Sequence, residues 1–398
     1  MLDPITEVLT RRTSEVLVRQ DLEKLLRSKK RLRIYYGIDP SGHQLHLGHA
    51  VCLLKFRELQ SLGHEMILLI GDFTAMIGDP TDRAEARIQL TAEQVKTNFK
   101  DYKKQVSKLL DFNNKKNPIR IVYNSKWLKK MSLKHVIELG AHFSVQQNMA
   151  RDMYQERLKH NKPIWIHEFL YPLMQGYDSV ALDVDLEIGG TDQTFNMLAG
   201  RELQRAYNNR DKHILTCPIL EGTDGRKMSK TYHNTINFSD SPEDMFGKVM
   251  SIKDDLILRY FELVTETPQM EIDKIKDDLA QGGNPRDAKL TLAKAIVSLF
   301  HSPSAAKKGE QHFRRVFQEQ KLPKDIPSMK IKEAGLPLFE LMVQGKLASS
   351  NSEAKRLIQQ GGVTINDAKI SDPFLLVKGD QQDKIIKVGK RRFLRVHS

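Results

Sequence analysis

The chain has 398 residues, enough for two or three domains with a real hydrophobic core, and its 40% hydrophobic and 28% charged residues are ordinary for a globular protein. No apolar run approaches the roughly 18 residues of a membrane span, and the first twenty residues lack the apolar core of a secretory signal. Two cysteines, Cys52 and Cys217, are too few for a disulfide framework or a cysteine metal cluster, so we expect a cytoplasmic protein that does not act at a membrane. Lys and Arg outnumber Asp and Glu by 63 to 50, which favours a polyanionic partner.

The first part of the chain alternates strand and helix patterns. Residues 33–38 (RIYYGI) predict a strand, a helix is expected from His46 to Gly63, and the apolar run 66–70 (MILLI) predicts a strand buried on both faces. The alternation continues to about Pro218. It indicates an α/β domain with a Rossmann-like, doubly wound parallel sheet over 1–232.

A second helix is expected to follow a capping box formed by Thr91 and Gln94. Its apolar face is predicted to carry Val95, Phe99, Tyr102, Val106 and Leu109. A short strand is then expected at 119–123 (IRIVY).

The second half changes in character. Leu, Ile and Phe recur at helical spacing and predict a helical domain over 233–320, and the two prolines and one glycine of 321–336 predict a linker. Residues 337–398 predict a small α/β unit with 11 Lys and Arg against 6 Asp and Glu. Its expected elements are a helix at 352–360, ended by Gly361 and Gly362, and strands at 363–366, 374–377, 384–388 and 392–396.

The first strand-to-helix turn carries His46-Leu47-Gly48-His49 in place of a Gly-rich phosphate loop. Histidines at positions i and i+3 share one helical face, Gly48 lets a ligand approach the backbone, and a helix N-terminus attracts phosphate. Taken alone, such a pair is more often a surface or packing feature.

A second motif, Lys227-Met228-Ser229-Lys230-Thr231, follows Gly225. Two lysines on a mobile loop can neutralise a triphosphate and follow a leaving pyrophosphate. By itself this segment is equally well read as a solvated basic loop.

Together the two motifs resemble the H-I-G-H and K-M-S-K-S signatures of class I aminoacyl-tRNA synthetases, with Leu47 for Ile and Thr231 for the last Ser as mild departures. Four further segments make the resemblance to bacterial-type tyrosyl-tRNA synthetases specific over essentially the whole chain. They are 35–40 (YYGIDP), 71–80 (GDFTAMIGDP), 168–179 (EFLYPLMQGYDS) and 189–193 (GGTDQ).

The resemblance implies a ligase that activates L-tyrosine with ATP and transfers it to tRNA-Tyr. It implies no tightly bound cofactor, no metal held by the protein, and Mg²⁺ arriving with ATP. It also implies a homodimer, formed by an insertion around 120–185 with the segment 133–149 near the interface.

The resemblance assigns a role to each matching residue. The residues implied to bind tyrosine are Tyr35 and Asp178 on the phenol hydroxyl, Asp79, Tyr171 and Gln175 on the ammonium group, and Thr74. Those implied to bind ATP are Asp39, Gly48, Gly190, Asp192 on the ribose, Arg83, Arg87 and Lys230. Those implied in catalysis are His46, His49, Lys227, Lys230, Thr231 and Gln193, the last orienting the reacting carboxyl group.

Each of these residues also has a purely structural interpretation. Tyr171 and Gln175 lie one helical turn apart and could be a buried polar pair. Asp79 before Pro80 could form a turn, and Asp178 could cap a helix. Their joint spacing, more than any single residue, favours the functional interpretation.

The segment 350–366 resembles the small RNA-binding module shared by ribosomal protein S-four and pseudouridine synthases. Basic side chains of the C-terminal unit would bind an RNA backbone with salt-dependent affinity and little sequence readout. The residues expected to do so are Lys355, Arg356, Lys390, Arg391 and Arg392.

Three rival interpretations remain. A synthetase for another aromatic amino acid would not need Tyr35 and Asp178, and tryptophanyl enzymes generally lack the C-terminal module. A non-catalytic RNA-binding protein on a synthetase scaffold need not keep both motifs. A small-molecule adenylyltransferase would not need the lysine loop or the RNA module.

Overall fold

A computed structural model describes residues 3–28, 30–81, 89–318, 326–331, 335–378, 383–389 and 392–397. The chain divides into two compact units. Unit 1 comprises 1–240 and 249–301, and unit 2 comprises 241–248 and 302–398. The helices expected within 233–320 are therefore shared between the units.

Unit 1 is built on a six-stranded sheet with the order β1-β6-β5-β2-β3-β4. Its strands are β1 (Glu15–Val16), β2 (Arg33–Ile38), β3 (Glu65–Ile70), β4 (Arg120–Tyr123), β5 (Leu186–Gly190) and β6 (His213–Cys217). Strands β2 to β6 are parallel and only β1 is antiparallel to its neighbour, which confirms the predicted doubly wound fold. The strand order reverses between β2 and β5, the place where such sheets bind ligands.

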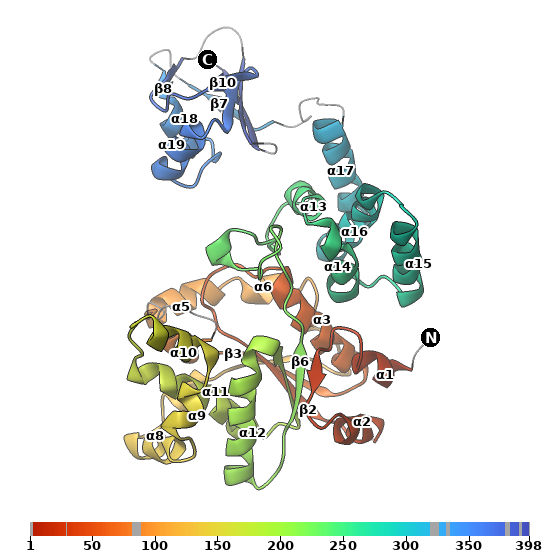
Figure 1. Ribbon diagram of the computed structural model, residues 1–398, viewed down its shortest axis with the longest axis vertical. Helices are drawn as coiled ribbons and strands as arrows, with labels where there is room; N and C mark the ends of the chain where they lie inside the picture. Colours follow the sequence, from red (N-terminus) through yellow and green to blue (C-terminus); the bar gives the residue numbers. More distant parts are fainter. Residues whose placement is uncertain are drawn as a thin grey trace. The chain divides into compact units, whose positions relative to one another are not determined.

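Helices cover both faces of this sheet (Figure 1). Right-handed crossovers put α3, between β2 and β3, on one face, and α12, between β5 and β6, on the other. The α-helices that lie wholly within unit 1 are α1 (Pro4–Val8), α2 (Arg19–Arg27), α3 (Leu47–Ser61), α4 (Thr74–Ile77), α5 (Ala92–Phe99), α6 (Tyr102–Val106), α7 (Ser125–Leu128), α8 (Leu133–Gly140), α9 (Val145–Met149), α10 (Asp152–Lys159), α11 (Ile166–Leu182), α12 (Thr194–Asn208), α14 (Ile257–Val264), α15 (Gln269–Ala280) and α16 (Pro285–Phe300). None of the helices in the described ranges has the length and apolar character needed to cross a membrane.

Local sequence explains two of these elements directly. All five residues of the 66–70 run are buried in β3, as expected for a strand covered on both faces. The capping box of Thr91 and Gln94 does begin a helix, but this helix ends at Phe99. A separate helix, α6, starts at Tyr102, so the single helix predicted up to Leu109 is wrong. The backbone of Asp101 leaves the helical region, at φ −100° and ψ 2°, and this breaks the helix.

Unit 2 contains helical segments and a C-terminal α/β module. The helical segments are α13 (Pro242–Met250), whose last two residues count with unit 1, and α17 (Pro303–Phe313), followed by a π-helical turn at Arg314–Gln318. The module has the sheet order β10-β9-β12-β13-β7 and a second, two-stranded sheet, β11-β8. Its elements are β7 (Ser328–Lys330), β8 (Leu336–Pro337), α18 (Leu338–Gln344), α19 (Asn351–Gln359), β9 (Val363–Ile365), β10 (Ala368–Ile370), β11 (Leu376–Val377), β12 (Lys384–Val388) and β13 (Arg392–His397).

Several features of this module differ from the expectation, and the strand expected at 374–377 covers only Leu376–Val377. The predicted linker contains β7, because Ser328–Lys330 pairs in parallel with the last strand, β13. The strand expected at 363–366 ends at Ile365, because Asn366 and Asp367 both have positive φ. Such a pair forms a tight hairpin turn and leads into β10, which was not predicted.

Candidate active site at the carboxyl ends of the parallel strands

The candidate site lies where four parallel strands of unit 1 end. Asp39 follows β2, Thr74 begins α4 just after β3, and Asp192 follows β5. The lysine loop at 227–231 comes from the connection that follows β6. Because carboxyl ends of parallel strands share one edge of the sheet, these segments converge at the reversal of strand order.

The two histidines of the first motif lie against each other at the start of α3. Their ring centroids are 4.0 Å apart, and the backbone N–H of His46 donates to Nδ1 of His49 at 3.2 Å. A Cβ on Gly48 would lie only 3.0 Å from the His46 ring, so glycine keeps this arrangement open. Burial lowers the pKa of His49 to about 4, with the positive charge of Lys230 acting in the same direction. Burial also lowers the pKa of His46 well below its usual value.

The lysine loop is held beside this motif. Backbone hydrogen bonds join Leu47 N–H to the carbonyl of Ile236, and Phe238 N–H to the carbonyl of Leu45, both at 2.9 Å. The side chain of Lys230 lies against Gly42, and a Cβ added to Gly42 would be 2.6 Å from Lys230 Nζ. The two motifs that sequence places about 180 residues apart are therefore neighbours in unit 1.

Lys227 reaches the segment after β5. Its Nζ lies 3.1 Å from Oδ2 of Asp192, whose other carboxylate oxygen occupies the space that a Cβ on Gly190 would need. Thr231 is exposed at the end of the loop, in a short 3-10 turn. Gly190, Asp192 and Lys227 thus form one contact group, in which a glycine is needed for the carboxylate to fold back.

Asp39 joins two residues that the sequence assigned to a different ligand. Its Oδ1 accepts from the hydroxyl of Thr74 at 2.7 Å, and its Oδ2 accepts from the hydroxyl of Tyr171 at 2.9 Å. The residue implied to bind ATP therefore shares one hydrogen-bond network with two residues implied to bind tyrosine.

Asp178 is a buried carboxylate on α11. Its two oxygens accept hydrogen bonds from Trp127 Nε1 at 2.8 Å and from Asn124 Nδ2 at 3.2 Å. Burial raises its pKa well above the usual range, although these hydrogen bonds act in the opposite direction. Asn124 also donates to the Thr74 hydroxyl at 3.0 Å, which links this carboxylate to the Asp39 network.

Tyr35 does not share a partner with Asp178 in this structure. Its hydroxyl lies 3.1 Å from Ser179 Oγ, and burial raises its pKa well above the usual value. Ser179 also accepts from Lys212 Nζ at 2.8 Å, and Lys212 forms a buried ion pair with Glu187. The expected pairing of Tyr35 with Asp178 on one hydroxyl is thus not preformed.

Gln175 and Asp79 contact different groups. Gln175 Nε2 lies 3.4 Å from Glu187, and its Oε1 is buried without a hydrogen-bond partner among the described residues. Asp79 accepts from Thr81 through Oδ1 and from Gln193 Nε2, at 2.8 Å, through Oδ2. The three residues implied to hold an ammonium group therefore take part in hydrogen bonds with different partners. Arg83 and Arg87 lie outside the described residues.

Comparison with known proteins identifies the family to which this chain belongs. A family model described as tRNA synthetases class I (W and Y) matches residues 27–318, and one described as the SYY-like C-terminal domain of tyrosine--tRNA ligase matches residues 318–396. The chain belongs to the class I tRNA synthetases (W and Y). Within that family, it is 46% identical to the tyrosine--tRNA ligase of Moorella thermoacetica, over 98% of this chain and 95% of that protein. It is 44% identical to the tyrosine--tRNA ligase of Thermotoga maritima, over 98% of this chain and 96% of that protein.

A solved structure gives the same result for this class I synthetase chain. A C-terminally truncated mitochondrial tyrosyl-tRNA synthetase of Coccidioides posadasii matches with a TM-score of 0.64 and 25% identity, over 78% of this chain and 92% of that one. The predicted family and fold are confirmed. The individual roles of the site residues remain predictions.

Several residues that contact the candidate site residues were not predicted from the sequence. Asn124 had a usable signal, because it directly follows a parallel strand, β4, at the edge where ligands bind. Ser179 stands at the end of the 168–179 segment, but no role was assigned to it. Trp127, Glu187 and Lys212 had no signal, because nothing in their sequence neighbourhood shows which carboxylate or hydroxyl they contact.

The basic residues expected to bind RNA differ in their surroundings. Arg356 is exposed on α19, whereas Lys355 lies over the rings of Phe339 and Phe374, at 4.4 and 4.8 Å from their centroids. Arg392 is engaged by Glu353 at 3.6 Å and by a backbone carbonyl. Lys390 and Arg391 lie outside the described residues.

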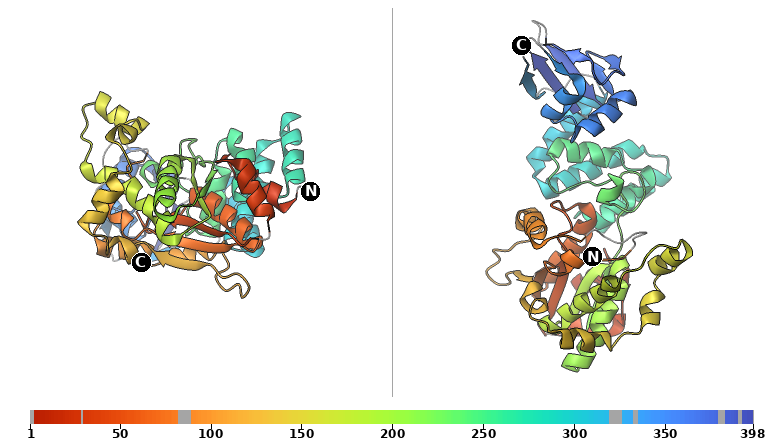
Figure 2. Two further views of the ribbon diagram at one scale, coloured as in Figure 1. Left: turned by 90° about the horizontal axis from the view of Figure 1, so that it is seen from below. Right: turned by 90° about the vertical axis from the view of Figure 1, so that its left-hand side faces the viewer.

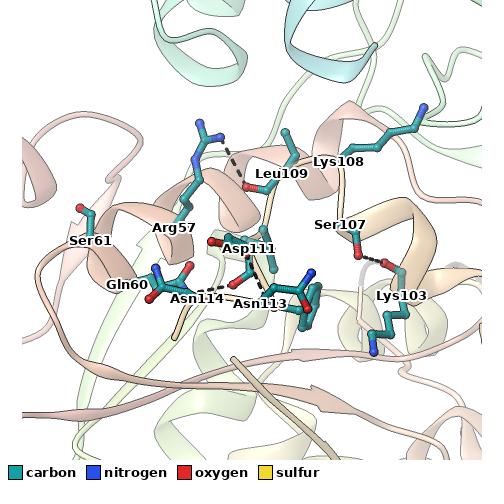
Figure 3. Close-up of a pocket in the computed structure, with 12 residues that line it drawn as sticks. Arg57, Gln60, Ser61, Lys103, Ser107, Lys108, Leu109, Asp111, Asn113 and Asn114 are labelled. Atoms are coloured by element: carbon teal, nitrogen blue, oxygen red, sulfur yellow. Dashed lines mark hydrogen bonds between the residues drawn. The ribbon is translucent and has the colours of Figure 1, made fainter. Parts of the chain in front are cut away.

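A large surface pocket of about 650 Å³ lies apart from the predicted site residues (Figure 3). Its lining comes from the end of α3, from α6 and from the turn at 109–114, with Arg57 and Lys103 among its cations. None of the residues assigned to tyrosine, ATP or catalysis lines it. Within the described ranges, no group of three or more His, Cys, Asp or Glu side chains is placed to hold a metal ion.

Proposed function

We propose that this chain is a tyrosine--tRNA ligase. It activates L-tyrosine with ATP, releasing pyrophosphate, and then transfers tyrosine from tyrosyl-adenylate to the 3′ end of tRNA-Tyr. The observation that carries the proposal is the 46% identity with a tyrosine--tRNA ligase over nearly the whole of both chains. The contact between the histidine and lysine motifs at the reversal of strand order supports the same activity.

Asp178 is proposed to select the substrate by accepting a hydrogen bond from its phenol hydroxyl. Its carboxylate is already oriented by Trp127 and Asn124, so binding need not order it. Phenylalanine would leave this buried group without the extra partner, which is costly. Rejection of phenylalanine by roughly 10⁵-fold is a known property of tyrosyl-tRNA synthetases, and the proposed role of Asp178 accounts for it in physical terms.

The ammonium group of tyrosine is proposed to lie among Asp79, Tyr171 and Gln175. The buried Oε1 of Gln175 has an acceptor position to offer, and Asp79 supplies a negative charge. Gln193, which bridges Asp79 and Asn196 at 2.8 and 3.0 Å, is then positioned to orient the carboxyl group that attacks.

The tyrosine carboxylate attacks the α-phosphorus of ATP in line, and a P–O bond breaks to release pyrophosphate. This reaction needs positioning and electrostatic stabilisation more than a general base. We propose that neutral His46 and His49 donate hydrogen bonds on the α-phosphate side, and that Lys227 and Lys230 follow the pyrophosphate. Asp192 would bind the ribose, with its lysine partner released, and Mg²⁺ would enter with ATP as part of the substrate.

The C-terminal module is proposed to bind tRNA-Tyr, and the chain is proposed to act as a cytoplasmic homodimer. Support for the dimer comes from large apolar side chains on α8, α9 and α11. Leu133, Ile137, Val145 and Ile166 are between 65% and 81% exposed in the single chain. An exposed apolar surface of this kind is typical of an interface.

The activity can be tested by ATP–pyrophosphate exchange with tyrosine, tryptophan and phenylalanine in parallel. The variants are Lys230→Ala and, as a matched control, Lys274→Ala, which removes an exposed lysine of α15. We expect exchange with tyrosine alone, a loss of about 10²-fold or more for Lys230→Ala, and wild-type rates for Lys274→Ala.

Two results would count against the proposal. Exchange with tryptophan instead of tyrosine would show that Asp178 does not select a phenol. Folded protein that exchanges with none of the three amino acids would favour a non-catalytic RNA-binding protein on the same scaffold.

A further inference from the structure

Three side chains of the connection between β3 and β4 bind one backbone loop. Asn98 of α5 donates from Nδ2 to the carbonyl of Pro40 at 2.9 Å. The hydroxyl of Tyr102, at the start of α6, donates to the carbonyl of Gly42 at 2.6 Å.

Gln105, also in α6, makes two bonds with the same loop. Its Nε2 donates to the carbonyl of His43, and its Oε1 accepts from the backbone N–H of Leu45, both at 2.8 Å. Gln105 and Tyr102 are buried, with 8% and 3% of their surfaces exposed, so water cannot readily replace their three bonds to the loop.

The loop held in this way, residues 40–45, lies between two parts of the candidate site. It begins after Asp39, which contacts Thr74 and Tyr171, and it ends at His46, the first residue of the histidine motif. In its middle Gly42 lies under Lys230 of the lysine loop.

We propose that Asn98, Tyr102 and Gln105 act as positioning residues for tyrosine activation. Together they fix the 40–45 loop, which determines the position of His46 and of the Gly42 backbone against which Lys230 lies. The inference rests on the proposed function. None of the three is a catalytic residue, since each acts through the backbone of the loop.

The hydrogen-bond pattern suits this role better than a purely structural one. The loop keeps a path with no regular secondary structure between β2 and α3, and the carbonyls of Pro40, Gly42 and His43 are bound by these three side chains in place of a helix or sheet ladder. Four bonds, to Pro40, Gly42, His43 and Leu45, leave little freedom for the groups at the two ends of the loop. A shift of about 1 Å in such groups costs on the order of 10²-fold in rate.

The test compares Gln105→Met with Gln60→Met in the full chain. Gln60 is a matched control, since it is also buried and its Nε2 also holds a loop, donating to the carbonyls of Asp111 and Asn117 at 3.2 and 2.8 Å. Tyr102→Phe is the second variant, which removes only the hydroxyl and keeps the ring. Melting temperature and the kcat and KM of tyrosine-dependent ATP–pyrophosphate exchange are measured for all of them.

Gln105→Met and Tyr102→Phe are both expected to lower kcat by roughly ten- to a hundredfold while the KM for tyrosine stays within about twofold. Gln60→Met is expected to lower the melting temperature as much as Gln105→Met does, with kcat close to wild type. Equal kcat for Gln105→Met, Tyr102→Phe and Gln60→Met would overturn the inference and leave the proposed function intact. A wild-type protein without tyrosine-dependent exchange would instead overturn the proposed function, and this inference with it.

Discussion

The protonation of His49 follows from its hydrogen bonds and its neighbours. Its Nδ1 accepts a hydrogen bond from the His46 backbone, so the hydrogen of the neutral ring is on Nε2. Burial and Lys230 lower its pKa to about 4, and the ring is therefore neutral at physiological pH. A neutral ring with Nε2–H can donate to a phosphate oxygen without itself adding charge to the site.

This lowered pKa predicts a pH-dependent stability. Between about pH 6.5 and pH 4 the unfolded chain binds a proton at this residue that the folded chain rejects, so stability is lost as the pH falls through that window. In His49→Asn, whose Oδ1 can accept from the same N–H, the free energy of unfolding in urea should fall less between pH 7 and pH 4.5. His46 acts in the same direction and leaves part of the slope in place.

His160→Asn is the control for this experiment, because it removes an exposed histidine of the same unit. It should keep the pH slope of the wild type. A His49→Asn variant with an unchanged slope would show that His49 is not held neutral by the fold.

The sequence could predict which residues lie together at the candidate site better than it could predict their hydrogen-bond partners. Asp178 and Tyr35 are both predicted to contact one substrate hydroxyl, and the sequence did not show that the Tyr35 hydroxyl lies beside Ser179 or that Asp178 accepts from Trp127 and Asn124. These contacts join side chains between 51 and 144 residues apart in the chain, and local spacing carries no information about them. Family resemblance identifies positions, whereas the network depends on how strands and helices pack.

At the scale of elements, the lysine loop is held in shape by the buried Asn234. Its Oδ1 accepts from Ser229 N–H at 2.8 Å, and its Nδ2 donates to Asp224 Oδ1 at 2.7 Å and to the carbonyl of Lys227 at 3.1 Å. One amide therefore joins both sides of the loop. Its position fixes the backbone of the segment that carries the two lysines.

Asn234→Asp should loosen this loop. The acceptor for Ser229 is kept, but a carboxylate replaces the donor that faces Asp224, and like charges repel. We expect faster cleavage by trypsin after Arg226, Lys227 and Lys230, and a kcat for tyrosine-dependent exchange that is lower by about tenfold or more, with little change in the KM for tyrosine.

Asn208→Asp is the matched control for this loop variant. Asn208 on α12 also donates to a carbonyl and to a carboxylate, those of Val180 and Asp183, at 3.1 and 3.3 Å. It should destabilise the chain without changing trypsin cleavage at the lysine loop. Equal cleavage in both variants would mean that Asn234 has no special role there.

Elements with a strong local pattern could be predicted, and elements defined by pairing could not. The 66–70 run and the helix after His46 carry their own signals, of burial on both faces and of capping and periodicity. Strand β7 lies in the segment predicted to be a linker, because a strand of only three residues shows no strand pattern in the sequence. It is a strand only because the last strand of the chain pairs with it.

At the scale of the whole molecule, α8 to α11 supply the surface proposed to join two copies. Figure 2 shows α8 to α10, in yellow, projecting from one edge of unit 1. Ile137 and Ile166 are 65% and 81% exposed there, a cost that association would remove. The double variant Ile137→Asp/Ile166→Asp should sediment as a monomer at concentrations where the wild type is a dimer.

A control for the dimer experiment is Met270→Asp, which places the same charge on an exposed apolar residue of α15. It should leave the dimer unchanged. A monomeric wild type at micromolar concentration, or a double variant that remains dimeric, would contradict the assignment of this surface.

The two steps of the proposed reaction should depend on different parts of the chain. Tyrosine activation needs only the site in unit 1, whereas transfer also needs tRNA, for which Arg356 offers an exposed cation on α19. Its neighbours are less available, because Lys355 lies over two aromatic rings and Arg392 faces Glu353. Among the three described residues expected to bind RNA, Arg356 is therefore the one whose charge can be changed with the least effect on packing.

Arg356→Glu should leave ATP–pyrophosphate exchange at the wild-type rate and lower kcat/KM for tRNA in aminoacylation by about tenfold at moderate salt. Losing one phosphate contact should also make the plot of log kcat/KM against log salt shallower by about 1. Lys24→Glu, a charge reversal at an exposed lysine of α2, is the control and should change neither quantity. If both reversals lowered kcat/KM equally, the effect would come from the net charge of the chain, and Arg356 would not lie at the RNA contact.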